Sequence, residues 1–319
     1  MDTSGKVLIV TGCENTFFPN LSVLIGSWLS HMGDFEIAVC DFGLSEIQKH
    51  ELSGISGLRI LSSDEKIETP FAGKTLIFTF LGEIVNQFNA IMWIDADAFF
   101  NSRLPDILSI LHGYDILIDS HIQSIGEISD RRNIEVCGLR KDDSYFSAGF
   151  WIAQPGNFLK VYEEIGTATR DRYYFWEADA FVSAIYREKL KIRTISGAVW
   201  HCRGKTSLDS CVVRGLTAYH LDQPIYVIHA NAYYWVKKNG RRILYRPTLA
   251  KLQQHYLNIY NLKLGLNSKQ NYPANYFQNY FKFLSYKIKT HTLSIIKTVL
   301  IFTGLFNVLK RFRNRVLSK

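Results

Sequence analysis

Residues Ala90–Phe100 read AIMWIDADAFF, an apolar run followed at once by two aspartates. The run from Ala90 to Ile94 predicts a buried β-strand, since short uninterrupted apolar runs are typical of strands covered on both faces. Asp95 and Asp97 then lie at the end of this strand, beside buried surface. Carboxylates are seldom placed there unless they are paired or bind a metal. Because Mg²⁺ and Mn²⁺ prefer oxygen ligands, the position predicts a divalent metal site, with a capped loop as the simpler alternative.

Upstream of this stretch, expected strands and helices alternate. Apolar runs predict strands at Lys6–Gly12, Glu36–Gly43 and Leu58–Ser63. Helical spacing predicts helices at Leu21–Met32, Leu44–Leu52 and Phe71–Phe88, with Ser45 as an N-cap. Such alternation favours a mostly parallel sheet with helices on both faces. Ligands of such sheets bind beyond the carboxyl ends of the strands, which is where Asp95 and Asp97 lie.

Downstream of Asp97 the expected pattern becomes mixed. Strands are predicted at Asp115–Asp119, Ser147–Ala153, Lys191–Ile195 and Ile225–His229, and helices near Asn157 and at Glu177–Arg187. We therefore expect an α/β fold with one catalytic domain over residues 1–250, built on a mixed, mainly parallel sheet. Residues 251–280 show no clear period and are interpreted as a connecting region. Residues 281–319 are apolar and basic and are expected to form a helical extension.

Five segments, in their order along the chain, resemble GT-A-fold (Rossmann-like) glycosyltransferases, especially those related to family eight. They are Ile9–Leu29 (IVTGCENTFFPNLSVLIGSWL), Ala90–Phe100 with its D-x-D, Tyr145–Phe158 (YFSAGFWIAQPGNF), Trp176–Tyr186 (WEADAFVSAIY) and Ile225–Trp235 (IYVIHANAYYW). The sequence departs from that pattern at three places. Ser147 replaces an Asn, Glu177-Ala178-Asp179 replaces D-Q-D, and the Gly and Lys that normally follow the late His are missing.

The resemblance implies a metal-dependent transfer of a hexose from a nucleotide sugar, with a UDP-sugar as the expected donor. It implies that Mn²⁺ or Mg²⁺ is held by Asp95, Asp97 and His229. It places donor contacts at Thr11, Gly12, Glu14, Lys74, Asp95, Ser147, Ala148 and Gly149. It assigns catalysis to Glu177 and Asp179. For His229 the alternative is a structural histidine, and for Lys74 a solvated helix lysine.

Glu177 and Asp179 begin a predicted helix. Their separation of two residues points them to different sides, so at most one is expected to face the reacting carbon. That residue would act as a base on the acceptor hydroxyl or stabilise the oxocarbenium-like centre. The alternative is that both merely favour the helix dipole. The basic segment His201–Lys205 (HCRGK) is a further candidate for contacting a diphosphate.

Charge is distributed unevenly along the chain. Carboxylates end at Asp222, and Gln223–Lys319 contains 17 Lys or Arg and no Asp or Glu. A basic rear end suggests an anionic partner, either membrane lipid or nucleic acid. Nucleic-acid binding leaves the strand-end carboxylates unexplained, so we expect no nucleic acid. A nucleotidyltransferase or related metal-dependent nucleotide enzyme is the other alternative, although TGCENT lacks a Gly-rich basic phosphate loop.

The C-terminal stretch Leu293–Leu309 (LSIIKTVLIFTGLFNVL) combines an apolar face with a polar stripe that includes Lys297. This pattern predicts a helix lying in a membrane interface, with a core or oligomer-contact helix and a single transmembrane pass as alternatives. The acceptor is therefore expected to be a glycan or a lipid-linked sugar used in cell-surface polysaccharide synthesis. Because a strand begins near Lys6, no signal peptide is expected. We expect a cytoplasmic protein, peripheral on the inner face of the membrane.

The sequence contains five cysteines, and no pair has the tight spacing of a zinc or redox site. Buried free thiols in a reducing compartment are therefore expected.

Overall fold

The computed structural model describes residues 6–129, 131–169, 177–203, 207–208, 210–229, 235–238, 241–244 and 247–265. Contacts within the chain group residues 1–231 with 252–270, and residues 232–251 with 271–319. In the second group the described strands are β13 (Trp235–Lys238) and β14 (Arg241–Leu244), which form an antiparallel hairpin.

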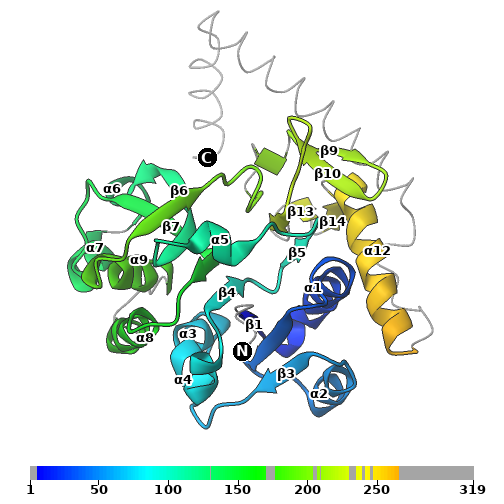
Figure 1. Ribbon diagram of the computed structural model, residues 1–319, viewed down its shortest axis with the longest axis horizontal. Coiled ribbons are helices and arrows are strands. Elements are labelled where there is room, and N and C mark those ends of the chain that lie inside the picture. Colours follow the sequence, from blue (N-terminus) through cyan, green and yellow to red (C-terminus); the bar gives the residue numbers. More distant parts are fainter. Residues whose placement is uncertain are drawn as a thin grey trace, which may run out of the picture. The chain divides into compact units, whose positions relative to one another are not determined.

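A seven-stranded sheet organises the first group, in the order β3-β2-β1-β4-β7-β6-β8 (Figure 1). Its strands are β1 (Val7–Cys13), β2 (Glu36–Asp41), β3 (Leu58–Leu61), β4 (Ala90–Ile94), β6 (Ile116–Ser124), β7 (Ser144–Ala153) and β8 (Ile192–Ile195). The first four strands are parallel, and β6 and β8 are parallel to each other. The longest strand, β7, runs antiparallel to both of its neighbours. The expected mixed, mainly parallel sheet is confirmed.

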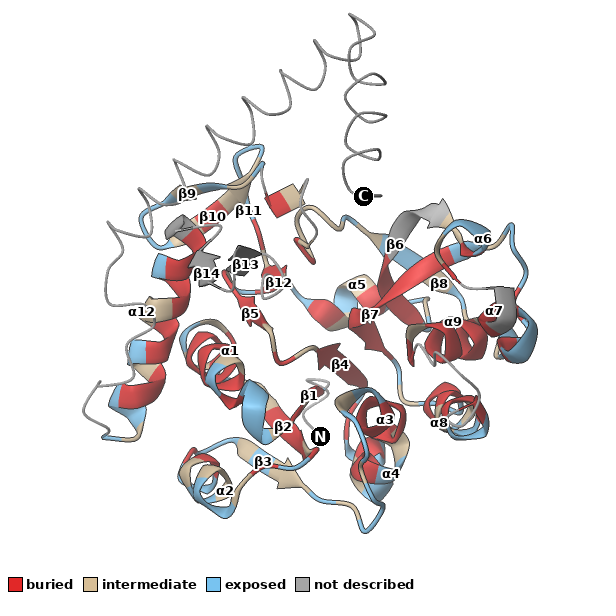
Figure 2. Ribbon diagram, turned by 180° about the vertical axis from the view of Figure 1, so that it is seen from behind, coloured by how far each residue is buried: buried red, intermediate tan, exposed pale blue. Residues whose placement is uncertain are grey.

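Helices cover both faces of this sheet. The described helices are α1 (Phe18–His31), α2 (Glu46–Ser53), α3 (Pro70–Thr75), α4 (Ile77–Leu81), α5 (Ile107–Leu111), α6 (Ile125–Ile128), α7 (Arg131–Cys137), α8 (Phe158–Thr169), α9 (Glu177–Arg187) and α12 (Pro247–Lys263). One buried cluster joins residues of β1, β4 and β7 to α4, α8 and α9. Leu8, Val10 and Trp93 point into it. Figure 1 shows α1 and α12 on the opposite side of the sheet, and the faces that the helices turn inward are buried (Figure 2).

The helical segment expected over Phe71–Phe88 is interrupted. It consists of α3, α4 and the 3-10 helix η2 (Gly82–Gln87). Leu76 has a non-helical backbone between the first two helices, and Gly82 has a φ of 49°. That left-handed conformation is open to glycine and ends α4. The expected N-cap is confirmed, because the side chain of Ser45 accepts a hydrogen bond from the backbone N–H of Gln48 in a capping box that starts α2.

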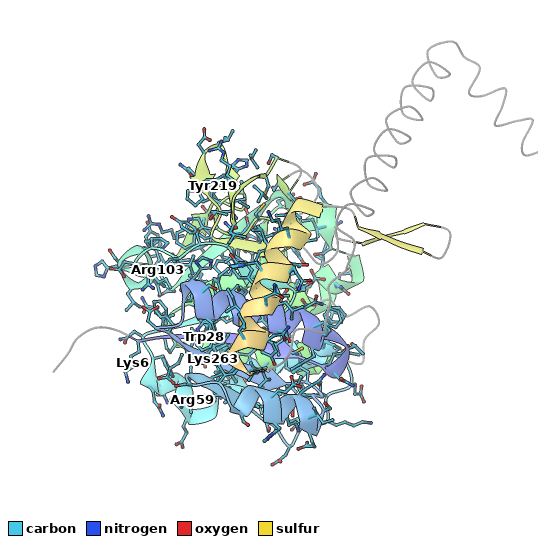
Figure 3. All side chains as sticks on the ribbon, turned by 90° about the vertical axis from the view of Figure 1, so that its right-hand side faces the viewer. Lys6, Trp28, Arg59, Arg103, Tyr219 and Lys263 are labelled. Atoms are coloured by element: carbon cyan, nitrogen blue, oxygen red, sulfur yellow. The ribbon has the colours of Figure 1, made fainter. Side chains whose placement is uncertain are left out.

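Helix α12 occupies the first part of the range that we expected to be a connecting region. Its residues Leu252, Tyr256 and Leu257 are buried. A Cβ added at Gly26 of α1 would lie 1.9 Å from the carbonyl oxygen of Tyr256, so only glycine permits this close approach. The Tyr256 hydroxyl also hydrogen-bonds His31 at 2.9 Å. Lys263 marks the C-terminal end of α12 in Figure 3.

In the part of the chain that the structure describes, no helix combines the length and the apolar character needed to cross a bilayer. The expected membrane-associating segment, residues 281–319, lies outside the described residues. Four of the cysteines are buried, and Cys211 is partly exposed. The Sγ atoms of Cys202 and Cys211 lie 3.5 Å apart, a proximity that their spacing in the sequence did not predict.

Candidate active site

The two aspartates of the D-x-D segment lie on a tight turn that links two strands. Asp95 follows β4, its backbone N–H donates to the carbonyl of Gly149, and its own carbonyl accepts from the N–H of Ala98. The chain then enters the short strand β5 (Ala98–Phe100), which pairs antiparallel with β12 (Val227–His229). In this register Ala98 lies opposite His229. The pairing of β5 with β12 therefore places His229 beside the turn that holds Asp95 and Asp97.

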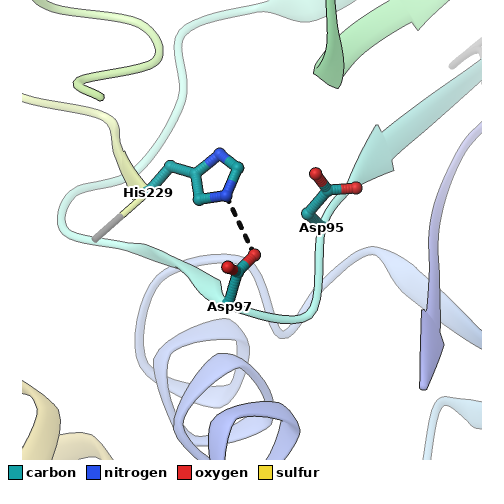
Figure 4. Close-up of side chains that lie close together, drawn as sticks. All are labelled: Asp95, Asp97 and His229. Carbon is teal, nitrogen blue, oxygen red and sulfur yellow. Dashed lines mark ion pairs between the residues drawn. The ribbon is translucent and has the colours of Figure 1, made fainter. Parts of the chain in front are cut away.

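One side-chain ligand atom from each of Asp95, Asp97 and His229 lies within 4.8 Å of the others. His229 Nε2 and Asp97 Oδ1 are 2.9 Å apart (Figure 4). The three side chains are 24%, 22% and 22% exposed, so the cluster is open to solvent on one side. Two carboxylates and an imidazole fit a divalent cation such as Mn²⁺ or Mg²⁺, and three protein ligands leave coordination positions for oxygen atoms of a substrate.

Asp97 and His229 each stabilise the charged form of the other. Burial alone would raise the pKa of Asp97, but the His229 imidazole beside it outweighs burial and holds that pKa below its usual range. Burial alone would lower the pKa of His229, but the Asp97 carboxylate raises it above its usual value. Without a cation the pair therefore favours the ionised carboxylate and the protonated imidazole, and a cation that bound here would take the place of the imidazole proton.

Lys74, near the end of α3, is buried beneath this cluster. Its Nζ lies 2.7 Å from Asp95 Oδ1 and 3.4 Å from Glu177 Oε1. Trp93 Nε1 donates to the same Asp95 oxygen at 2.7 Å, and the Lys74 ammonium lies 5.4 Å from the centre of the Trp93 ring. Burial opposes the charge on Lys74, but Asp95 and Glu177 outweigh it and raise its pKa. Lys74 is thus a buried ion-pair partner, and the solvated alternative is excluded.

Glu177 and Asp179 face different parts of the molecule, as their spacing predicted. Glu177 points to Lys74, and its other oxygen, Oε2, is buried without a hydrogen-bond partner among the described residues. Burial raises the pKa of Glu177, which Lys74 opposes and Asp95 reinforces. Asp179 instead accepts hydrogen bonds from Ser129 Oγ at 2.6 Å and Asn133 Nδ2 at 2.7 Å. Only Glu177 therefore lies beside the metal-ligand candidates.

Two further residues, Asp119 and His201, lie behind His229. Asp119 was not singled out from the sequence, and His201 was expected only as part of the basic segment His201–Lys205. His201 is completely buried, and its Nε2 lies 3.0 Å from His229 Nδ1. Asp119 Oδ2 accepts a hydrogen bond from Arg203 Nε at 2.9 Å and lies 3.5 Å from His201 Nδ1. Asp119 had a signal that resembles Asp95, since it follows the apolar residues Ile116–Ile118 of a strand. His201 begins the basic segment HCRGK, but no local signal in the sequence placed it behind His229.

The basic segment proposed to contact a diphosphate is described only as far as Arg203, whose side chain bonds to Asp119. Burial lowers the pKa of His201 to about 4, so its imidazole is neutral near pH 7.

The expected donor contacts lie at several places along the sheet edge. Gly149 borders the cluster, since a Cβ there would lie 2.9 Å from Asp95 Oδ2 and 3.0 Å from His229 Cε1. Its neighbour Ser147 is buried and accepts a hydrogen bond from the Gly149 N–H through its Oγ, and Ala148 is buried in the core.

At the end of β1 the remaining donor candidates differ in exposure. Thr11 is completely buried, and its Oγ1 has no hydrogen-bond partner among the described residues. Gly12 is covered by the Phe42 ring, which occupies the space that a Cβ would need. The carboxylate of Glu14 accepts a hydrogen bond from Thr16 Oγ1 at 2.5 Å. Donor contact by these residues stays a prediction.

No model of a known protein family matches the sequence, and no curated protein does. Solved structures match the fold. The chain is similar to the galactosyltransferase LgtC in complex with donor and acceptor sugar analogs, at 12% identity and a TM-score of 0.50, over 85% of this chain and 99% of LgtC. An active-site mutant of LgtC matches with the same identity and coverage and a TM-score of 0.51. The apo bifunctional glycosyltransferase WbbM matches at 11% identity with a TM-score of 0.53, over 88% of this chain and 52% of WbbM.

These identities establish the fold alone, and the fold is that of GT-A glycosyltransferases. The GT-A expectation is confirmed at this level. Assignment to a family-eight-like group stays a prediction, because no sequence match accompanies the structural one.

Proposed function

We propose that this protein is a metal-dependent glycosyltransferase that moves a hexose from a nucleotide sugar, with a UDP-sugar as the expected donor. The observation that carries the proposal is the cluster of Asp95, Asp97 and His229 at the carboxyl edge of a GT-A sheet. In the reaction, the bond between the anomeric carbon and the phosphate oxygen breaks, and a bond from the acceptor oxygen to that carbon forms. The acceptor hydroxyl loses its proton, and a nucleoside diphosphate leaves.

Asp95, Asp97 and His229 would hold Mn²⁺ or Mg²⁺. When bound, the ion would neutralise charge on the departing diphosphate. Asp95 has one oxygen engaged by Lys74 and Trp93, so its Oδ2, on the side of Gly149, is the free ligand atom. Lys74 fixes the Asp95 carboxylate and adds positive charge beneath the site.

Glu177 is the favoured catalytic carboxylate of the pair predicted from the sequence. It lies next to Lys74, and one of its oxygens lacks a partner in the described part of the protein. A buried carboxylate in this position can accept a proton from a hydroxyl or stabilise positive charge at the anomeric carbon. Asp179 is committed to Ser129 and Asn133 and positions the first turn of α9.

The acceptor is proposed to be a glycan or a lipid-linked sugar of cell-surface polysaccharide synthesis. The support is the apolar and basic composition of residues 281–319, which favours an anionic membrane surface as partner. The protein would then act in the cytoplasm on the inner face of the membrane. Hexose transfer, the pathway and this location rest on the sequence pattern and are tested by the experiments below.

The test is a screen of nucleotide sugars with Mn²⁺ present that follows release of nucleoside diphosphate. We expect release from one donor, faster when the acceptor glycan is added and absent in Asp97→Asn. Release of inorganic diphosphate instead would indicate the nucleotidyltransferase alternative. No turnover of any nucleotide sugar, by a protein that binds Mn²⁺, would contradict the proposed function.

A further inference from the structure

Four side chains form a continuous line of contacts that ends at the metal-ligand candidate His229. Arg203 Nε lies 2.9 Å from Asp119 Oδ2, the same oxygen lies 3.5 Å from His201 Nδ1, and His201 Nε2 lies 3.0 Å from His229 Nδ1. His229 Nε2 then faces Asp97 Oδ1 at 2.9 Å. Asp119 is not among the residues expected to act in catalysis, to contact the donor or to bind the metal, and His201 was expected only within the basic segment His201–Lys205.

The line lies inside the protein and is held on several sides. His201 is completely buried, and its ring lies against Phe150, with 5.6 Å between the ring centres. Asp119 is buried except for a small part of its surface, and a Cβ added at Gly197 would lie 2.5 Å from its Oδ1. The absence of a side chain at Gly197 therefore lets one carboxylate oxygen lie close to the backbone, while Arg203 holds the other by a hydrogen bond.

The chemistry of imidazole determines which nitrogen of each histidine donates a hydrogen bond along this line and which one accepts. A neutral imidazole has one N–H donor and one bare nitrogen acceptor. His201 Nδ1 is buried without a hydrogen-bond partner among the described residues, and Asp119 Oδ2 lies 3.5 Å from it. Because a carboxylate only accepts, its charge favours the form of His201 whose Nδ1 carries the proton. His201 Nε2 is then the acceptor and takes the Nδ1–H of His229. Nε2 of His229, the nitrogen that faces Asp97 and the proposed metal position, is then the nitrogen available to a cation.

We propose that Asp119 and His201 are positioning residues that fix the ring orientation and the tautomer of His229 for metal binding, with Arg203 fixing Asp119. This inference rests on the metal site of the proposed function but is separable from the transfer of a sugar. A partner that orients a ligating histidine commonly changes metal affinity by about 10- to 100-fold when it is removed.

The test measures Mn²⁺ affinity of the full-length protein by electron paramagnetic resonance of the free ion, which needs no donor. His201→Phe keeps an aromatic ring beside Phe150 but offers no acceptor, and we expect Mn²⁺ to bind it at least about tenfold more weakly. His201→Gln offers an amide oxygen to the His229 N–H, so we expect affinity within about threefold of wild type. A purely structural His201 predicts the opposite order, because Phe replaces a buried ring better than Gln does.

A double-mutant cycle tests whether Asp119 acts through His201. Asp119→Asn alone is expected to weaken Mn²⁺ binding severalfold, and to weaken it no further in a protein that already carries His201→Phe. Asp34→Asn, at a surface pair with Arg103, and His31→Gln, at a pair with Tyr256, are matched controls that should bind Mn²⁺ as wild type does. If His201→Phe does not fold, the Mn²⁺ affinity of the single Asp119→Asn variant still tests whether Asp119 contributes to metal binding.

Three results would overturn the proposal. They are unchanged affinity in a folded His201→Phe or Asp119→Asn protein, equal weakening in the Phe and Gln variants, and additive weakening in the double variant. A wild-type protein that binds no Mn²⁺ would overturn both this inference and the metal site of the proposed function. Mn²⁺ binding with the expected order of variants, but without turnover of any nucleotide sugar, would overturn only the proposed function.

Discussion

Lys74 Nζ lies 2.7 Å from Asp95 Oδ1, and this ion pair separates the roles of the two carboxylate oxygens. Trp93 donates to the same oxygen, so Oδ1 is bound inside the protein. The other oxygen, Oδ2, lies on the side of Gly149 and His229. Lys74 thus balances the buried charge of Asp95 in the absence of a cation while leaving a ligand atom on the open side.

Replacing Lys74 by Met should destabilise the metal-free protein by about 3 kcal/mol, because Asp95 and Glu177 would keep buried charge without their cation. Added Mn²⁺ should raise the melting temperature of Lys74→Met more than that of wild type, since the ion replaces part of the missing charge. Urea denaturation measures the loss of stability, and melting curves with and without Mn²⁺ measure the change in melting temperature. Lys160→Met, at an exposed pair with Glu164, is the control and should change stability by less than about 0.5 kcal/mol. Equal stability of the Lys74 and Lys160 variants would show that the buried pair contributes nothing.

Removing either aspartate of the D-x-D segment should abolish sugar transfer. Asp95→Ala and Asp97→Ala each delete one of the three ligand candidates, and chelation of the wild-type protein should have the same effect. Nucleoside diphosphate release in chelator, followed by addition of Mn²⁺, measures the loss and the recovery. Asp34→Ala, at the exposed pair with Arg103, should keep full activity. Full activity of the wild-type protein in chelator would rule out a metal-dependent reaction.

Local sequence signals were sufficient to predict the position of the carboxylates at the end of β4 and the different orientations of Glu177 and Asp179. An apolar run predicts a buried strand, so an Asp that follows it directly is placed at the end of that strand. Helical geometry points residues two apart to different sides. The line from Asp119 to His229 could not be predicted in this way. It depends on a bridge between Cys202 and Ile228 and on the pairing of β5 with β12, contacts between segments far apart in the sequence.

The missed helix α12 has a similar cause. Its residues show no clear apolar period because part of its packing consists of backbone contact with Gly26, which a hydrophobic pattern does not record. The interruption of the segment after Phe71 depends instead on the left-handed backbone of Gly82. An isolated glycine in a helical pattern is usually tolerated, so the pattern alone favoured a continuous helix.

Glu177→Gln should lower turnover by about a hundredfold or more, as the loss of a base or charge stabiliser does, without lowering the melting temperature at neutral pH. The pKa of Glu177 is raised by burial, so the folded protein holds its proton more tightly than the unfolded chain. Its ionised form therefore lowers stability as pH rises above the ordinary value of 4.5, and Gln removes that cost. Melting curves over a pH series should show the advantage of Gln disappearing below that value.

Asp179→Asn is the matched variant for Glu177→Gln. Its amide would bring a donor toward Ser129 or Asn133, which already donate, so the protein should melt at lower temperature while the folded fraction keeps near-normal turnover. Near-normal turnover in both variants would favour the helix-dipole interpretation of the two carboxylates.

Deleting Phe281–Lys319 should release the protein from membranes while leaving hydrolysis of the donor largely intact. The basic side chains of this segment, among them Lys310, Arg311 and Arg313, would each add about 1 kcal/mol near an anionic leaflet. The full-length protein should bind anionic liposomes better than neutral ones, with the difference shrinking at high salt. A full-length protein that ignores anionic liposomes would contradict the membrane role.

Gly149→Ala should weaken Mn²⁺ binding by about tenfold while the protein still folds, because the added methyl group points into the cluster of ligand candidates. Its Cβ would lie 2.9 Å from Asp95 Oδ2 and 3.0 Å from His229 Cε1, so one of these side chains must move. Asp95 is held at its other oxygen by Lys74 and Trp93, and His229 is held from behind by His201, so neither moves without losing a hydrogen bond.

The control is Gly156→Ala, where the nearest atom to the added Cβ is 3.9 Å away and no ligand candidate is near. Mn²⁺ titration of both variants, with melting curves to confirm folding, measures the difference. Equal affinity of Gly149→Ala and Gly156→Ala would mean that the ion does not sit between Asp95 and His229, because a methyl group between two ligands cannot leave their geometry unchanged.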